Sequence, residues 1–125
     1  MRYSPALIEG LLMPGEDIIW IQAGFFDSRD WITGKRRKRS GRMVASNLRL
    51  VFFHVTRGRV QLESILYSQI QKLEIEKKGF FETLCFEVAN NPCRLRCWSS
   101  PLIRGHLYWL RQRCSVTSAS WHTGI

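Results

Sequence analysis

The stretch from Gly41 to Lys78 constrains the fold most, because its residues follow the pattern of successive β-strands. Charged side chains occupy every second position from Lys72 to Glu76, and this period of two is typical of a strand with one solvent-facing and one buried side. A glycine-containing turn at residues 56–59 separates two segments rich in branched and aromatic residues. These segments predict an antiparallel meander, with Asn47 adopting positive φ in its first turn. The expected strands are Gly41–Ser46, Leu48–Val55, Val60–Leu66 and Ile70–Lys77.

Further strand-like segments flank the meander on both sides. An apolar run from Asp17 to Phe26 predicts a first strand, and two alternating segments after Gly79 predict a sixth and a seventh. Apolar residues then repeat at helical spacing from Ile103 to Cys114. We expect a short N-terminal helix at residues 4–13, strands between about 17 and 98, and a C-terminal helix at about 101–113. The fold class is therefore mainly β plus one α, a seven-stranded antiparallel sandwich or barrel capped by its last helix.

The length of 125 residues fits one domain with a single core, and the hydrophobic share of 45% favours a folded chain over a disordered one. We expect this single domain over residues 1–114 and a flexible tail over the small, polar residues 115–125. The formal net charge of +9 predicts a polyanionic partner, which could be an anionic membrane lipid, an acidic protein surface or nucleic acid.

Neither an export signal nor a membrane-spanning segment is expected. The N-terminus lacks a sustained apolar core, and no apolar run approaches the roughly 20 residues that a spanning helix needs. The interpretation is a cytoplasmic chain, soluble or peripheral to a membrane, whose cysteines stay reduced and act as small hydrophobic residues. No cofactor and no metal site is predicted. The four cysteines are Cys85, Cys93, Cys97 and Cys114.

Four short motifs, in this order, carry a resemblance to a known family. Pro14-Gly15-Glu16 precedes the first expected strand, and Gly41 opens the second. Ser46-Asn47-Leu48-Arg49-Leu50-Val51-Phe52 and Ile65-Leu66-Tyr67-Ser68-Gln69-Ile70 follow. Over about Leu11 to Arg113 the chain resembles a pleckstrin-homology (PH)-like domain of the GRAM or bacterial PH type. The resemblance implies a non-catalytic binding scaffold, which relatives use for anionic lipid headgroups, protein partners or self-assembly.

Five consecutive cations, from Lys35 to Arg39, bear most directly on function. Such a run repels itself and predicts an exposed loop between the first two strands. Trp31, just before the run, is a candidate anchor at a membrane interface. In PH-like domains that bind phosphoinositides this loop carries the headgroup site, often helped by the loop between strands three and four. The resemblance thus gives these candidate headgroup-binding residues: Lys35, Arg36, Arg37, Lys38, Arg39, Arg42, Arg57 and Arg59.

One departure from the family pattern limits this site. The phosphoinositide pattern usually begins with a lysine late on the first strand, and residues 18–26 contain none. Diffuse attraction to an anionic surface is therefore favoured over a stereospecific headgroup pocket. At about 1 kcal/mol per basic residue, six cations could contribute roughly 5–6 kcal/mol to attachment before the cost of ordering the loop.

Other functions stay open at this point. The cations also suit nucleic-acid backbones, although no recognisable nucleic-acid module is present and aromatic residues are not interleaved with the basic run. A protein-interaction or self-assembling module is a second alternative, in which Trp98, Tyr108 and Trp109 could be anchors; most of them are expected in the core. A solvated loop without any ligand is a third.

An enzyme is not predicted. His54 and His106 lie in no nucleophile or metal signature, and His54 is expected to be a partly buried structural residue. Glu63, Glu74 and Glu76 are interpreted as solvent-facing strand residues rather than an acid–base pair. Arg49 is interpreted as a strand residue that binds a neighbouring loop.

Overall fold

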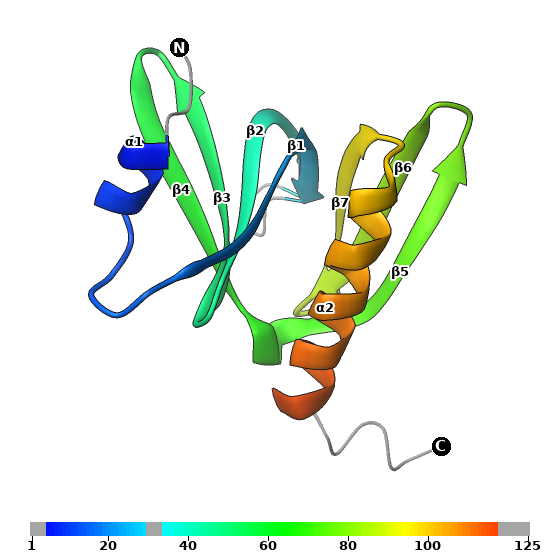
Figure 1. The fold of residues 1–125 in the computed structure, drawn as a ribbon. Helices are drawn as coiled ribbons and strands as arrows, with labels where there is room; N and C mark the ends of the chain where they lie inside the picture. Colours follow the sequence, from blue (N-terminus) through cyan, green and yellow to red (C-terminus); the bar gives the residue numbers. More distant parts are fainter. Residues whose placement is uncertain (1–4, 30–33, 118–125) are drawn as a thin grey trace.

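Seven antiparallel strands form one continuous sheet in the computed structural model of the chain, which describes residues 5–29 and 34–117. Within these residues the strand order is β4-β3-β2-β1-β7-β6-β5, and a long C-terminal helix packs beside the sheet (Figure 1). The elements are α1 (Pro5–Gly10), β1 (Ile18–Arg29), β2 (Arg36–Ser46), β3 (Arg49–Thr56), β4 (Arg59–Leu66), η1 (Tyr67–Gln69), β5 (Ile70–Lys78), β6 (Phe81–Val88), β7 (Asn91–Trp98) and α2 (Pro101–Thr117). The predicted mainly β class with a C-terminal helix is confirmed.

The predicted meander is correct for three of its four strands. β2, β3 and β4 pair in sequence order, and Arg57 and Gly58 both adopt positive φ in the tight β3–β4 turn. The fifth strand does not join β4, because the 3-10 helix η1 turns the chain and β5 pairs with β6 instead. The Tyr67 hydroxyl fixes this turn by donating a hydrogen bond to the Ser46 carbonyl at 2.5 Å, and it lies 2.9 Å from the Arg49 carbonyl. β4 and β5 are thus the two edges of the sheet.

A pair of glycines bends the sheet into two lobes. Gly24 of β1 and Gly41 of β2 are opposite each other in the ladder. A Cβ atom on Gly41 would lie 2.0 Å from the Phe53 carbonyl oxygen, and one on Gly24 would lie 2.7 Å from the Arg96 carbonyl oxygen. Since only hydrogen fits at either position, β1 and β2 can approach their outer neighbours closely. Figure 1 shows the result, in which β4-β3-β2 and β7-β6-β5 form separate lobes joined through β1.

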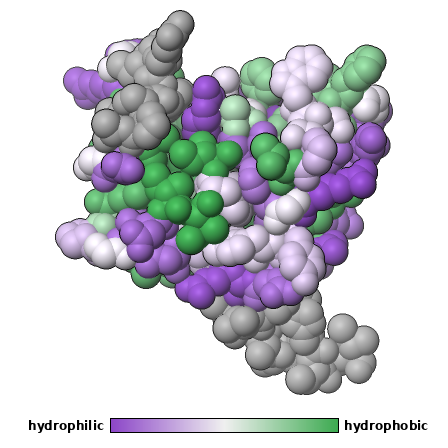
Figure 2. All heavy atoms as spheres, in the orientation of Figure 1, coloured by the Kyte–Doolittle hydropathy of each residue, from purple (hydrophilic) through white to green (hydrophobic). Residues whose placement is uncertain are grey.

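The core lies between the lobes and is closed by α2 (Figure 1). Leu110 and Cys114 of α2 are buried in it, and the Trp20 ring stacks on His106 with centroids 4.4 Å apart. Helix α1 covers a second apolar cluster on the opposite face of the first lobe, where Phe53 is fully buried. Figure 2 shows apolar residues gathered on the surface over β1.

Several element boundaries differ from the prediction. α1 ends at Gly10 rather than near 13, and α2 continues to Thr117. Residues 118–125 of the predicted tail, and Ser4, lie outside the described residues. Asn47 does not adopt positive φ. Its side-chain oxygen instead accepts a hydrogen bond from the Asp17 amide at 2.7 Å and holds the β2–β3 turn against the start of β1.

A buried ion pair attaches the segment before β1 to β3. Arg49 Nε donates to Glu16 Oε2 at 2.9 Å, and the Ser46 hydroxyl donates to the same oxygen at 2.6 Å. The hydrogen bond from Arg49 is the main reason that the pKa of Glu16 is lowered to about 2. The interpretation of Arg49 as a strand residue that binds a neighbouring loop is therefore confirmed.

The cysteines of the core are free thiols. Burial raises the pKa of Cys93, Cys97 and Cys114 to about 11, so each behaves as a small hydrophobic residue.

Candidate anion-binding face

The basic run lies mostly in a strand, so the prediction of a loop is wrong, although Lys35 to Lys38 are exposed as predicted. Arg36 to Arg39 belong to β2 and continue its ladder with β1, where Lys38 is opposite Asp27. Side chains therefore alternate between the two faces of the sheet. Arg36 and Lys38 project to the outer face, and Arg37 and Arg39 to the face that carries the core.

Arg39 is buried and cannot serve as a ligand-binding cation. Its Nε donates to Glu63 Oε2 at 2.6 Å, and its Nη2 donates to Glu63 Oε1 and to the Ser28 hydroxyl, both at 2.8 Å. Its guanidinium also lies 5.1 Å from the centre of the Phe26 ring. Because these contacts satisfy the charge within the molecule, Arg39 is a structural residue.

Glu63 and His54 lie in the same cluster as Arg39. Glu63 was expected to face solvent, but it pairs with Arg39 across β3. His54 is buried, as expected of a structural histidine, and its Nε2 lies 3.2 Å from Glu63 Oε2. Burial lowers the pKa of His54.

The other predicted site residues divide between separate places. Lys35 is exposed directly before β2. Arg42 is half-buried and donates to the Gly41 carbonyl at 3.3 Å, among other contacts. Arg57 and Arg59 are exposed at the β3–β4 turn. Trp31 lies outside the described residues.

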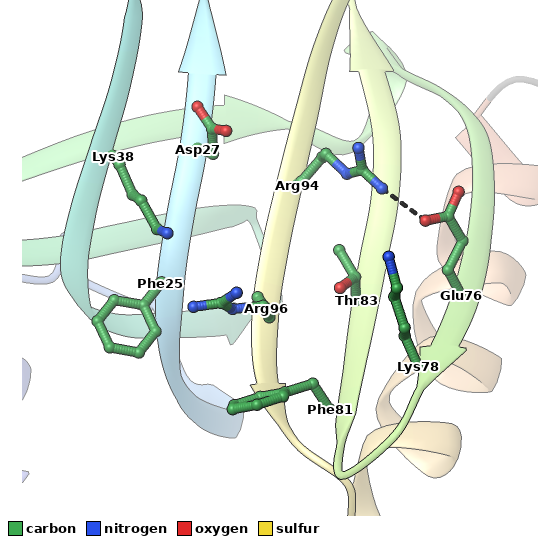
Figure 3. Close-up of a pocket in the computed structure, with 9 residues that line it drawn as sticks. All are labelled: Phe25, Asp27, Lys38, Glu76, Lys78, Phe81, Thr83, Arg94 and Arg96. Carbon is green, nitrogen blue, oxygen red and sulfur yellow. Dashed lines mark hydrogen bonds and ion pairs between the residues drawn. The ribbon is translucent and has the colours of Figure 1, made fainter.

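Two arginines of β7 join the outer face of the basic strand. β1 pairs with β2 on one side and with β7 on the other, so that Asp27 is opposite both Lys38 and Arg94, and Phe25 is opposite Arg96. The strands surround a solvent-open hollow of about 450 Å³, to which β5 contributes Glu76 and Lys78 (Figure 3). We refer to this surface as the outer hollow. Its cations are Lys38, Lys78, Arg94 and Arg96.

Aromatic rings and cations alternate across the outer hollow. The Arg96 guanidinium lies 4.9 Å from the centre of the Phe81 ring and 5.6 Å from that of Phe25 (Figure 3). Lys38 Nζ lies 5.8 Å from the centre of the same Phe25 ring. Trp98 stacks on Phe81, with centroids 4.6 Å apart and an interplanar angle of 26°. No described residue accepts a hydrogen bond from the Arg96 guanidinium, so its N–H groups are held in place by rings and stay available to an anion.

Two carboxylates moderate the charge of the outer hollow. Arg94 Nη2 lies 2.5 Å from Glu76 Oε2, which ties this arginine to β5 (Figure 3). Asp27 Oδ1 is buried and has no hydrogen-bond partner among the described residues. The surface is still net positive, since four cations face two carboxylates.

Comparison with known proteins identifies the fold. No family model and no curated protein matches the chain. Among solved structures, the Vps36 N-terminal PH domain is similar at 12% identity and a TM-score of 0.59, over 84% of this chain and 83% of that one. A linker-DH/PH fragment of p115-RhoGEF is similar at 11% identity and a TM-score of 0.55, over 92% of this chain and 34% of that longer one. The chain has a PH-like fold.

A third similar structure is the hSac2 domain of the human phosphoinositide phosphatase Sac2. It has 14% identity and a TM-score of 0.51, over 96% of this chain and 86% of that one. At these identities the likeness establishes the PH-like architecture alone, and the GRAM or bacterial subtype stays a prediction.

The residues that β7 contributes to the outer face of this PH-like domain were not among the predicted site residues, although the sequence of β7 indicates which way they point. Arg94, Arg96 and Trp98 alternate with buried Cys93, Leu95 and Cys97, so their outward direction can be read from β7 itself. What the local pattern does not contain is the pairing of β7 with β1, about 70 residues away in the chain. That long-range pairing brings both arginines beside Lys38. Within the described residues, no helix has the length and apolar character needed to cross a bilayer.

Proposed function

We propose that this PH-like domain is a non-catalytic peripheral module that attaches reversibly to anionic lipid surfaces through the outer hollow and the exposed end of β2. The observation that carries the proposal is the grouping of exposed cations from three distant segments on one outer face. Arg36 and Lys38 come from β2, Arg96 from β7 and Lys78 from β5. Because an anionic leaflet attracts each basic group near its surface, such a grouping suits a membrane.

The magnitude fits reversible attachment. At about 1 kcal/mol per cation, these four contribute roughly 4 kcal/mol, which is about a thousandfold preference for anionic over neutral lipid before losses. Arg94 is left out of this sum because Glu76 already neutralises it. Asp27 lowers the value further. The cytoplasmic leaflet carries most anionic lipid, so we propose a cytoplasmic, peripheral location.

The proposal moves the binding site away from the β3–β4 turn, and two matched variants test this. Lys38→Gln with Lys78→Gln removes two charges from the outer hollow, whereas Arg57→Asn with Arg59→Gln removes two charges from the turn. In co-sedimentation with vesicles of phosphatidylcholine and phosphatidylserine, the first pair should weaken binding roughly tenfold to thirtyfold. The second pair should weaken it less than about threefold. Equal losses, or a larger loss from the turn variant, would contradict the proposal.

Single-stranded nucleic acid is the second candidate ligand, because rings and cations alternate on the same face in the manner of single-strand binding platforms. Competition separates the two. An oligothymidylate or oligouridylate should fail to displace the protein from anionic vesicles at equal phosphate concentration. Displacement at a lower phosphate concentration than that of the lipid would favour nucleic acid. An absence of vesicle binding altogether would favour a protein-interaction or self-assembling module.

A further inference from the structure

An exposed apolar tip lies at one end of the outer hollow. Phe80 is 79% exposed, and Trp98 and Leu102 are each 68% exposed, which is more than any other large hydrophobic residue of the described chain. They come from the β5–β6 turn, the end of β7 and the start of α2, which lie at the same end of the molecule (Figure 1). A hydrogen bond from the Ser99 amide to the Phe80 carbonyl, 2.8 Å long, joins the first two of these segments. We call these three residues the apolar tip.

The apolar tip rests on a base of packed and hydrogen-bonded side chains. Trp98 is stacked on Phe81, and the Ser99 hydroxyl donates to Glu82 Oε1 at 2.7 Å beneath it. Glu82 itself is buried, so its carboxylate is shielded from a surface that approaches the tip. Ile103, the neighbour of Leu102, is fully buried and fixes the start of α2. The exposed side chains therefore project from a supported platform and contribute little to the core.

We infer that the apolar tip inserts into the interfacial region of a lipid bilayer, and this inference rests on the proposed function. The occupant is lipid because of what surrounds the tip. Exposed cations border it, namely Lys77 and Lys78 before the turn and Arg104 in the first turn of α2. A tryptophan with adjacent apolar residues and a cationic border is the combination that settles at the level of the headgroups, with the cations against lipid phosphates.

The tip also continues directly into the outer hollow. From Trp98 the contacts run through Phe81 to Arg96, then to Phe25, and from there to Lys38. This row of side chains is apolar at the Trp98 end and cationic at the Lys38 end. A bilayer that receives the tip would thus meet Arg96 and Lys38 at successively shallower depths. Trp98 then holds the anchor role that the sequence assigned to Trp31.

Fluorescence with brominated lipids tests the insertion. Vesicles and neutral phosphatidylcholine micelles are prepared with bromine on the acyl chains near the headgroup, and quenching of protein tryptophan is measured. Trp98→Phe should remove most of the quenched signal, which assigns it to Trp98. Phe80→Ser with Leu102→Ser should weaken binding to anionic vesicles at least about fivefold. The fraction of vesicle binding that persists at high salt should also be smaller in this variant than in the wild type.

The matched control is Tyr108→Ser, because Tyr108 is 67% exposed on α2 but belongs to neither the turn nor the helix start. It should bind vesicles like the wild type. All replaced residues are exposed, and circular dichroism verifies that each variant folds. Equal vesicle binding by wild type and the double serine variant, or an equal loss from Tyr108→Ser, would overturn the inference.

The neutral micelles separate this inference from the proposed function. Quenching of Trp98 in micelles without any preference for anionic vesicles would support insertion of the apolar tip and contradict attachment through the outer hollow. Binding to anionic vesicles without quenching would support attachment through the outer hollow and contradict insertion of the tip. Absence of both signals would reject both.

Discussion

At the residue scale, Arg39 shows that a cation in a basic run can belong to the core. Its guanidinium meets Glu63 in a two-point contact, with Nε at 2.6 Å and Nη2 at 2.8 Å from the two carboxylate oxygens. Removing the carboxylate alone would leave a buried, uncompensated charge. We therefore predict that Glu63→Ala lowers the free energy of unfolding by about 3 kcal/mol in urea titrations.

Two further variants make this prediction specific. Lys38→Gln, one residue before Arg39 but exposed, should change the free energy of unfolding by less than about 0.5 kcal/mol. Replacing both partners by apolar residues, as Arg39→Met with Glu63→Leu, should recover most of the loss because no buried charge remains. A loss below about 1 kcal/mol in Glu63→Ala would mean that water already satisfies Arg39.

At the element scale, the sequence predicts most strands because their signals are local. Alternation and turn residues locate β3, β4, β6 and β7 to within a few positions. The prediction missed the first residues of β2, from Arg36 to Ser40, because five adjacent cations favour a loop when only their mutual repulsion is considered. In the structure, pairing with β1 sends alternate cations to opposite faces, and Glu63 neutralises Arg39, the buried one of the two that point inward. The pairing comes from the neighbouring strand β1, whereas Glu63 lies 24 residues from Arg39 in the chain.

The candidate site was predictable only in part for the same reason. Lys38 and Arg36 were found as members of a basic run, but nothing near them in sequence indicates Arg96 or Phe81. These residues meet because β1 pairs with β2 and with β7 at once. Phe80 and Trp98 were hard to assign for another reason. A small sandwich usually buries its aromatic residues, and only the fold reveals which ones stay outside.

The close pairing of β2 with β3 depends on a glycine in β2, and this gives a prediction. Gly41→Ala would place a methyl group 2.0 Å from the backbone oxygen of Phe53, so β2 and β3 would have to separate. We expect a loss of at least about 3 kcal/mol in stability, or failure to fold. Gly105→Ala is the control, since nothing lies within 4 Å of its added Cβ atom in α2. It should raise the melting temperature, as alanine is favoured by about 1 kcal/mol within a helix. Equal effects in both variants would contradict the close approach of the strands.

At the scale of the whole molecule, buried titratable groups make stability depend on pH in two separate ranges. Burial lowers the pKa of His54 and of His106 below the ordinary value of 6.5. The unfolded chain therefore binds more protons than the folded one as pH falls below about 6.5, and stability decreases. The pKa of Glu16 is lowered from 4.5 to about 2, chiefly by Arg49. Its contribution is complete above about 4.5 and is lost as pH falls towards 2.

Urea unfolding of the wild type and of two variants between pH 7 and pH 3 can separate the histidine contribution from the Glu16 contribution. His54→Gln should reduce the slope of unfolding free energy against pH between about 6.5 and 5, leaving the part due to His106. Glu16→Gln should leave that range unchanged and flatten the curve below pH 4.5, at a cost of roughly 3 kcal/mol at neutral pH. Constant wild-type stability from pH 7 to 5 would show that both imidazoles accept protons within the fold. Glu16 and Arg49 join the segment before β1 to β3. The loss of stability below pH 4.5 therefore measures how strongly this ion pair holds that segment against the lobe formed by β4, β3 and β2.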